Sequence, residues 1–155
     1  MLIKFFLLNF ILISLSINNV LGKQYILKWF NNSEVLDFLE FNDKYKYQIT
    51  LDEESWEDSE ENYGFLKCLG PIMISPEGKI EVEVFCKGYN HLENNFYLKL
   101  IRKSDYDVWV DENIYLSGSG RYKDFINKKC KYAIKYIIGV TKGFYRQICK
   151  WNIGY

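Results

Sequence analysis

The sequence has little histidine, little proline and no excess of charge of one sign. His91 is the only histidine among 155 residues, which argues against a metal site or a catalytic triad built on several histidines. Two prolines argue against a disordered linker protein. Twenty basic and twenty acidic residues leave a formal net charge of zero, so composition gives no indication of nucleic-acid binding. We expect no cofactor, no metal and no nucleic-acid partner.

Long apolar runs are also scarce, and the one present lies at the start. Residues 5–13 (FFLLNFILI) follow a single basic residue, Lys4, and small or modest side chains occupy residues 20–22. This order is typical of a secretory signal peptide. The run is shorter than the roughly 20 residues that span a bilayer comfortably. We predict a signal peptide over residues 1–22, one mature domain over residues 23–155, no membrane span, and an extracellular location.

Four cysteines follow the predicted signal peptide, and an even count in a secreted chain predicts two disulfides. A C-x-x-C motif is absent, which argues against zinc. Residues 75–78 (SPEG) have the composition of a type I turn, so the flanking segments predict a β-hairpin. Pairing outward from this turn brings Cys68 nearly opposite Cys86. We therefore predict a Cys68–Cys86 bridge and, by elimination, a Cys130–Cys149 bridge.

Thirteen tyrosines, eleven phenylalanines and alternating apolar positions favour β-strands. Residues 34–41 fit either a helix face or an irregular strand, and residues 122–126 fit one helical turn. Seven to nine short strands predict an all-β domain, a small β-sandwich of transthyretin or immunoglobulin type. The strand candidates are residues 24–30, 45–51, 65–74, 79–87, 95–103, 108–110, 114–116, 130–138 and 144–151.

Two charged stretches each allow two interpretations. Residues 52–61 (DEESWEDSEE) hold seven acids in ten positions. We expect a solvated loop, because the spacing of a calcium-binding EF-hand is absent. The C-terminal part is basic, and its cations either form a solvated face or contact an anionic surface. The candidate contact residues are Lys128, Lys129, Lys131, Lys135, Arg146 and Lys150.

Residues 31–33 (NNS) form a glycosylation sequon, so Asn31 is a candidate glycan site and the protein a candidate glycoprotein.

Several segments resemble the nematode transthyretin-like family over about residues 45–155. Residues 47–51 (YQITL) are similar to the strand that precedes an acidic loop in that family. Residues 75–84 (SPEGKIEVEV) resemble its turn and following strand, and residues 130–137 (CKYAIKYI) resemble its later cysteine-containing strand. The family's early cysteine and its H-x-C element have no counterpart here. The resemblance implies an extracellular transthyretin-type sandwich without enzyme activity that acts at cell surfaces or in a host.

We expect a secreted binding or bridging protein, not an enzyme, whose partner is an extracellular or cell-surface protein, a glycan or a lipid. Aromatic residues commonly anchor such contacts. The alternative is an extracellular carrier of a small apolar ligand, with a pocket formed by residues such as Phe85, Phe96 or Trp109. A hydrolase would need acids that converge in a cleft, for which the candidates are Asp105, Asp107, Asp111 and Glu112.

Overall fold

The structure is a computed structural model that describes residues 23–41, 45–105, 110–138 and 142–151. The predicted signal peptide lies outside these ranges, as do Asp107 and Trp109. The chain divides into a large unit, Tyr25–Cys149, and a small unit at the chain ends, of which only residues 23, 24, 150 and 151 are described. No helix in the described ranges has the length and apolar character needed to cross a membrane.

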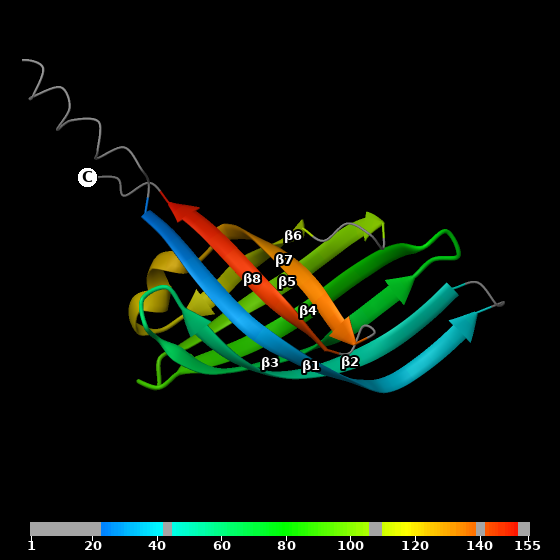
Figure 1. Ribbon diagram of the computed structural model, residues 1–155, viewed down its shortest axis with the longest axis horizontal. Helices are drawn as coiled ribbons and strands as arrows, with labels where there is room; N and C mark the ends of the chain where they lie inside the picture. Colours follow the sequence, from blue (N-terminus) through cyan, green and yellow to red (C-terminus); the bar gives the residue numbers. More distant parts are fainter. Residues whose placement is uncertain (1–22, 42–44, 106–109, 139–141, 152–155) are drawn as a thin grey trace, which may run out of the picture. The chain divides into compact units, whose positions relative to one another are not determined.

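Eight antiparallel strands pair in chain order and close into a barrel (Figure 1). A single 3-10 helix, η1 (Gly120–Phe125), lies between the sixth and seventh strands. The strands are β1 (Lys23–Phe41), β2 (Tyr45–Asp58), β3 (Tyr63–Ile74), β4 (Lys79–Asn90), β5 (Asn95–Asp105), β6 (Val110–Gly118), β7 (Lys129–Ile138) and β8 (Lys142–Trp151).

The predicted β-sandwich, of transthyretin or immunoglobulin type, is therefore wrong. A sandwich and a barrel both place alternate side chains inward, so alternation cannot distinguish them. The difference lies in strand length and in the sheet edges. Strands of 9 to 19 residues accumulate enough twist and coil for one sheet to close on itself, and closure leaves no free edge. The sandwich implied by the family resemblance is corrected by the same finding.

The first strand candidate and the segment that fitted either a helix or a strand form one strand. Residues 24–30 and 34–41 both lie in β1, and the register with β2 shifts between Val35 and Asp37. One extra residue in a bulge reverses which side chains face inward. This reversal explains why residues 34–41 show no clean alternation in the sequence.

The acidic run is not a loop over most of its length, which corrects a second expectation. Residues 52–58 continue β2. Asp52, Glu54 and Trp56 face inward and are buried, whereas the residues between them are exposed. The run therefore alternates like any half-buried strand, with carboxyl groups at two inward positions.

The predicted hairpin and both predicted disulfides are confirmed. The Ser75 amide donates to the Lys79 carbonyl at 2.8 Å across the turn between β3 and β4. Cys68 lies directly opposite Cys86 in the register, and the two are bonded. The Cys130–Cys149 bridge joins β7 to β8 in the same way. Two buried disulfides are consistent with an extracellular protein.

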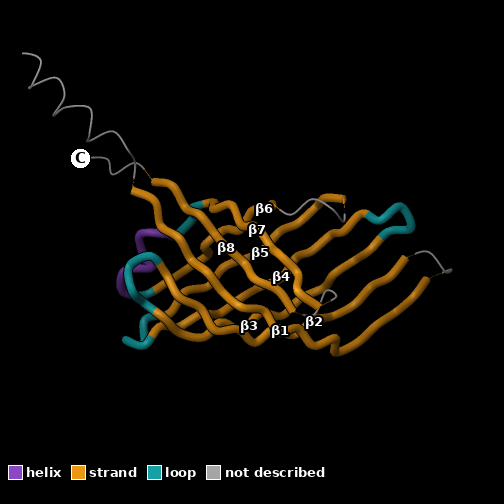
Figure 2. Tube along the Cα trace, viewed as in Figure 1, coloured by secondary structure: helices purple, strands orange, loops and turns teal. Residues whose placement is uncertain are grey.

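One end of the barrel is filled by aromatic side chains. Figure 2 shows η1 at the same end as the turns that join β2 to β3 and β4 to β5. The Phe96 and Tyr122 rings lie 4.8 Å apart, and those of Tyr115 and Phe125 lie 5.0 Å apart. Two residues of η1, Tyr122 and Phe125, thus close the barrel with large rings.

Candidate ligand-binding site

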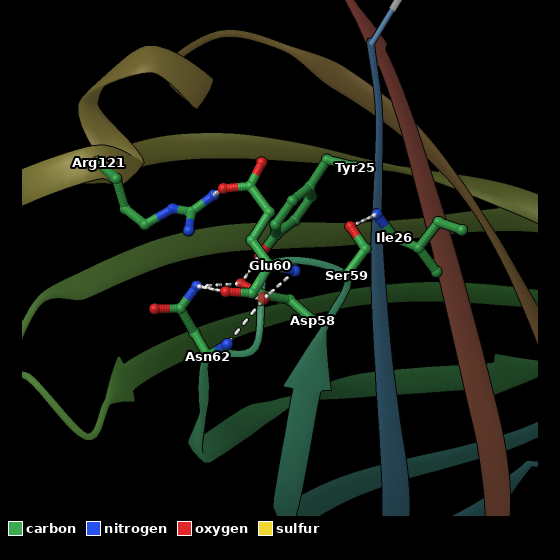
Figure 3. A network of polar contacts seen from close by, with 7 residues as sticks. All are labelled: Tyr25, Ile26, Asp58, Ser59, Glu60, Asn62 and Arg121. Atoms are coloured by element: carbon green, nitrogen blue, oxygen red, sulfur yellow. Dashed lines mark hydrogen bonds and ion pairs between the residues drawn. The ribbon is translucent and has the colours of Figure 1, made fainter.

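A polar network at the β2–β3 turn holds the closed end in place (Figure 3). The Asp58 carboxylate accepts hydrogen bonds from the backbone amides of Glu60 at 2.8 Å and Asn62 at 2.9 Å, and from the Tyr25 hydroxyl at 3.1 Å. Arg121 of η1 forms an ion pair with Glu60. The turn is thereby tied both to β1 and to η1.

Burial raises the pKa of the Tyr25 phenol, and the nearby Tyr115 and Asp58 raise it further. Burial likewise raises the pKa of Tyr122 to about 12. Both phenols are therefore neutral over the physiological range.

The opposite end of the barrel holds a cavity of about 60 Å³. It lies inside the end that carries the β3–β4 turn, because Ile74 and Ile80 flank that turn and line the cavity. Half of the lining residues are aliphatic, and most of these come from β3, β4 and β5. The aliphatic side chains of these strands are Ile72, Ile74, Ile80, Val82, Val84 and Leu100.

Alternation places these side chains in the cavity wall. The sequence predicts Ile80, Val82 and Val84 on one face of a strand, and the structure confirms that this face points inward. In β5, the inward series that begins with Phe96 in the aromatic core continues to Leu100 and Arg102 in the cavity wall. One end of β5 thus contributes to the aromatic core, and its other end contributes to the cavity wall.

Two inward carboxyl groups of β2 lie in the polar part of this interior. Asp52 lines the cavity and is 8% exposed, and Glu54, two residues closer to the aromatic end, is 4% exposed. Asp52 Oδ1 and Glu54 Oε2 have no hydrogen-bond partner among the described residues. The alternation of β2 puts both carboxyl groups on the same inner face.

Burial shifts both carboxyl groups toward the neutral form. Desolvation raises the pKa of Asp52, and a hydrogen bond with the Ser33 side chain offsets part of this rise. Desolvation raises the pKa of Glu54 well above its ordinary value, and the neighbouring Asp52 charge raises it further. Both carboxyl groups of this polar part therefore bind a proton more readily than exposed carboxyl groups do.

Arg102 is the one basic residue in the cavity lining, and its charge is matched elsewhere. Its Nε lies 3.4 Å from Asp111 Oδ2 of β6. The guanidinium also donates to Ser104 Oγ at 2.9 Å and to the Asp105 carbonyl at 3.3 Å. Arg102 thus belongs to a polar cluster with β6 and the end of β5.

Asn31, the predicted glycan site, is 2% exposed and lines the cavity. Its side-chain amide donates to Ser33 Oγ at 2.8 Å. Glycosylation at Asn31 stays a prediction, and in the folded protein the acceptor nitrogen lies inside the barrel.

The predicted basic contact residues are spread over the C-terminal strands. Lys131, Lys135 and Arg146 are exposed on β7 and β8. Lys128 lies over the Phe125 ring at 5.9 Å, and Lys129 lies 4.0 Å from Glu112. Lys150 is exposed near the end of β8. Contact with an anionic surface stays a prediction.

Two of the residues expected to line an apolar pocket, Phe85 and Phe96, are described, and neither lines the cavity. Phe85 is 50% exposed on the outer surface, where Lys99 lies over its ring at 5.4 Å. Phe96 is part of the aromatic core, and Trp109 lies outside the described residues. Of the acids proposed for a hydrolase, Asp105 and Glu112 are exposed, Asp111 pairs with Arg102, and Asp107 lies outside the described residues.

Asp52, Glu54 and Arg102 are interior residues that were not predicted from the sequence. The signal for the two acids was the strict alternation that ends at Trp56, which is visible once the run is treated as a strand. Within the described ranges, no three His, Cys, Asp or Glu side chains come together to hold a metal ion.

A solved structure supports the fold. No protein-family model matches the sequence, and no curated protein matches it either. A crystal structure of a Clostridium acetobutylicum protein of unknown function is similar, with a TM-score of 0.71 and 9% sequence identity. The match covers 83% of this chain and 99% of that protein. At this identity the likeness establishes the shared barrel fold alone.

Proposed function

We propose that this chain is a secreted, non-catalytic carrier. It holds a small, mostly apolar ligand inside the barrel end that carries the β3–β4 turn. The cavity of about 60 Å³ among aliphatic side chains carries this proposal. A barrel of eight strands has an interior that either is filled by side chains or holds one small ligand. This barrel does both, because aromatic rings fill one end and the other end retains space.

Secretion is part of the proposal. It rests on the signal-like residues 1–22 and on the two disulfides, which persist in oxidising compartments. Bridges between neighbouring strands also keep the wall rigid, and a preformed site loses less entropy on binding.

The test is to fill the cavity. Val82→Phe adds a ring to the cavity wall, whereas Glu81→Phe, one residue earlier, adds the same ring to the outer face. Hexanol serves as the probe, with binding followed by NMR chemical-shift titration. We expect the wild type and Glu81→Phe to bind hexanol and Val82→Phe to lose at least ten-fold in affinity. Equal affinity in all three proteins would contradict a binding site inside the barrel.

A second candidate function is the binding of a protein, glycan or lipid partner at a cell surface. Exposed apolar side chains on the outer faces of β3 and β4 favour it, because Phe65 lies opposite Tyr89 and Leu69 lies opposite Phe85. Contiguous exposed apolar surface often marks an interaction site. In this case Phe85→Ser would reduce the binding of labelled protein to intact cells and Val82→Phe would not. The reverse result would favour the carrier.

A further inference from the structure

Among the described residues, no ion pair is formed by Asp52, the carboxyl group in the cavity lining. Asp52 is more than nine-tenths buried, its Oδ1 has no partner among the described residues, and it lines the cavity. Glu54 lies next along the same inner face and presents a second oxygen without a partner. Buried carboxyl oxygens of this kind are normally hydrogen-bonded, because an unmade hydrogen bond in the interior is unfavourable.

The one cation in the lining does not supply the missing charge. Arg102 is held 3.4 Å from Asp111 and donates to Ser104 and to the Asp105 carbonyl. The ion pair with Asp111 balances the Arg102 charge within the wall. The Asp52 side of the cavity is therefore acidic. Asp52 Oδ1 has no donor among the described residues, and a ligand can bring one.

We infer that the ligand carries a primary ammonium group, which donates hydrogen bonds to Asp52 while its alkyl part lies against the isoleucine and valine wall. This inference rests on the proposed carrier function and specifies the ligand class. An ammonium group has three donors and no acceptor, which complements a carboxylate with one oxygen that lacks a donor among the described residues. A carboxylate ligand would instead place like charges together.

The size of the cavity limits the enclosed part of the ligand. Its volume of about 60 Å³ is smaller than the roughly 150 Å³ of an engineered cavity that binds benzene. The ammonium group and a few carbons fill this space. A longer alkyl chain would extend past Ile74 and Ile80, toward the barrel end that carries the β3–β4 turn.

Proton uptake and ligand binding compete at Asp52. The carboxylate must be ionised to pair with an ammonium group, so affinity rises with pH as Asp52 loses its proton. The other titratable or charged groups that face the same interior are Glu54 on β2, Arg102 on β5, Tyr132 on β7 and Tyr145 on β8. Substitution of Asp52 alone separates its titration from theirs.

The test compares three probes of equal chain length: hexylammonium, hexanol and hexanoate. Affinities are measured by calorimetry and NMR titration between pH 4 and pH 8, a range that begins near the ordinary pKa of an aspartate. We expect the wild type to prefer hexylammonium, and its affinity to rise with pH while that for hexanol does not. Asp52→Asn should lower the hexylammonium affinity by about ten- to a hundred-fold, the range for a hydrogen bond to a charged group, and leave hexanol binding within about two-fold.

Glu53→Gln is the matched control. Glu53 is the exposed neighbour on β2 and pairs with Lys67, so the substitution removes one charge without reaching the cavity. Binding of hexanol with no preference for the amine, or with a preference for hexanoate, would overturn the ammonium inference and leave the carrier function standing. No binding of any probe would contradict both. The pH dependence in the wild type needs no variant, so the test holds even if Asp52→Asn does not fold.

Discussion

The buried carboxyl of Glu54 should make the protein less stable as pH rises. Burial raises its pKa above the ordinary value of 4.5, so the folded state holds a proton that the unfolded state has already lost. The contribution of Glu54 to stability is then greatest below pH 4.5 and declines as pH increases toward the raised pKa. Glu54→Gln removes this titration, and we expect the variant to be more stable than the wild type at neutral pH.

The magnitude follows from the linkage of one proton. Within the window between the unfolded and folded pKa, the stability advantage of Glu54→Gln grows by about 1.4 kcal/mol for each pH unit. Above the folded pKa the advantage stays constant. Asp52 adds a second, parallel decline, because burial raises its pKa too. This second decline remains in the variant.

Urea denaturation with intact disulfides, repeated between pH 4 and pH 8, measures this advantage. Glu53→Gln is the control, since Glu53 is the exposed neighbour on the same strand, and its effect should vary little with pH. An advantage of Glu54→Gln that is independent of pH, or a variant less stable than the wild type at pH 7, would refute the account of a buried, unpaired carboxyl.

Three further substitutions test the fold. Replacing Cys68 and Cys86 with alanine opens a loop of sequence separation 18, so we expect a loss of about 3 kcal/mol in chemical denaturation on the chain-entropy relation. Gly88→Ala places a methyl group 2.2 Å from the Phe96 ring, and calorimetry should show a loss of about 1–3 kcal/mol. Gln147→Ala removes the partner of two buried polar side chains, so a urea midpoint shift should report about 3 kcal/mol.

The β3–β4 hairpin was predictable because its signals are local. The turn residues 75–78 set the register, and the register alone brings Cys68 opposite Cys86. The alternation of Ile80, Val82 and Val84 then assigns the inner face. Each step depends on residues close together in the sequence, and no step needs the position of a distant strand.

Barrel closure was not predictable because it depends on contacts that the sequence does not mark. β1 and β8 come together at the closing seam, where the Trp29 and Tyr145 rings stack at 5.0 Å. These residues are more than one hundred positions apart, and the same alternation would serve a sandwich. The bulge after Val35 further hides the periodicity of β1, because a single extra residue reverses the inward positions.

The acidic run was misinterpreted because charge density normally predicts solvent exposure. That rule holds for Glu53 and Glu57, which lie outside, and fails for Asp52 and Glu54. An inward carboxyl is unfavourable unless something compensates for it. The rule states that charged residues are exposed on average. It therefore fails at an interior position that carries a carboxyl group, and such exceptions are expected at functional sites.

Two carboxyl groups on β2 illustrate the difference between a structural and a binding position. Asp58 receives hydrogen bonds from Tyr25, Glu60 and Asn62, so its own chain supplies the donors that it needs. Asp52, six residues earlier on the same strand, faces a cavity with one oxygen lacking a partner. Apolar side chains of similar volume would make that position more stable. The aromatic end and the two disulfides stabilise the fold enough to offset this unfavourable position. The hydrogen-bond donor that Asp52 Oδ1 lacks is the group that a bound ligand would provide.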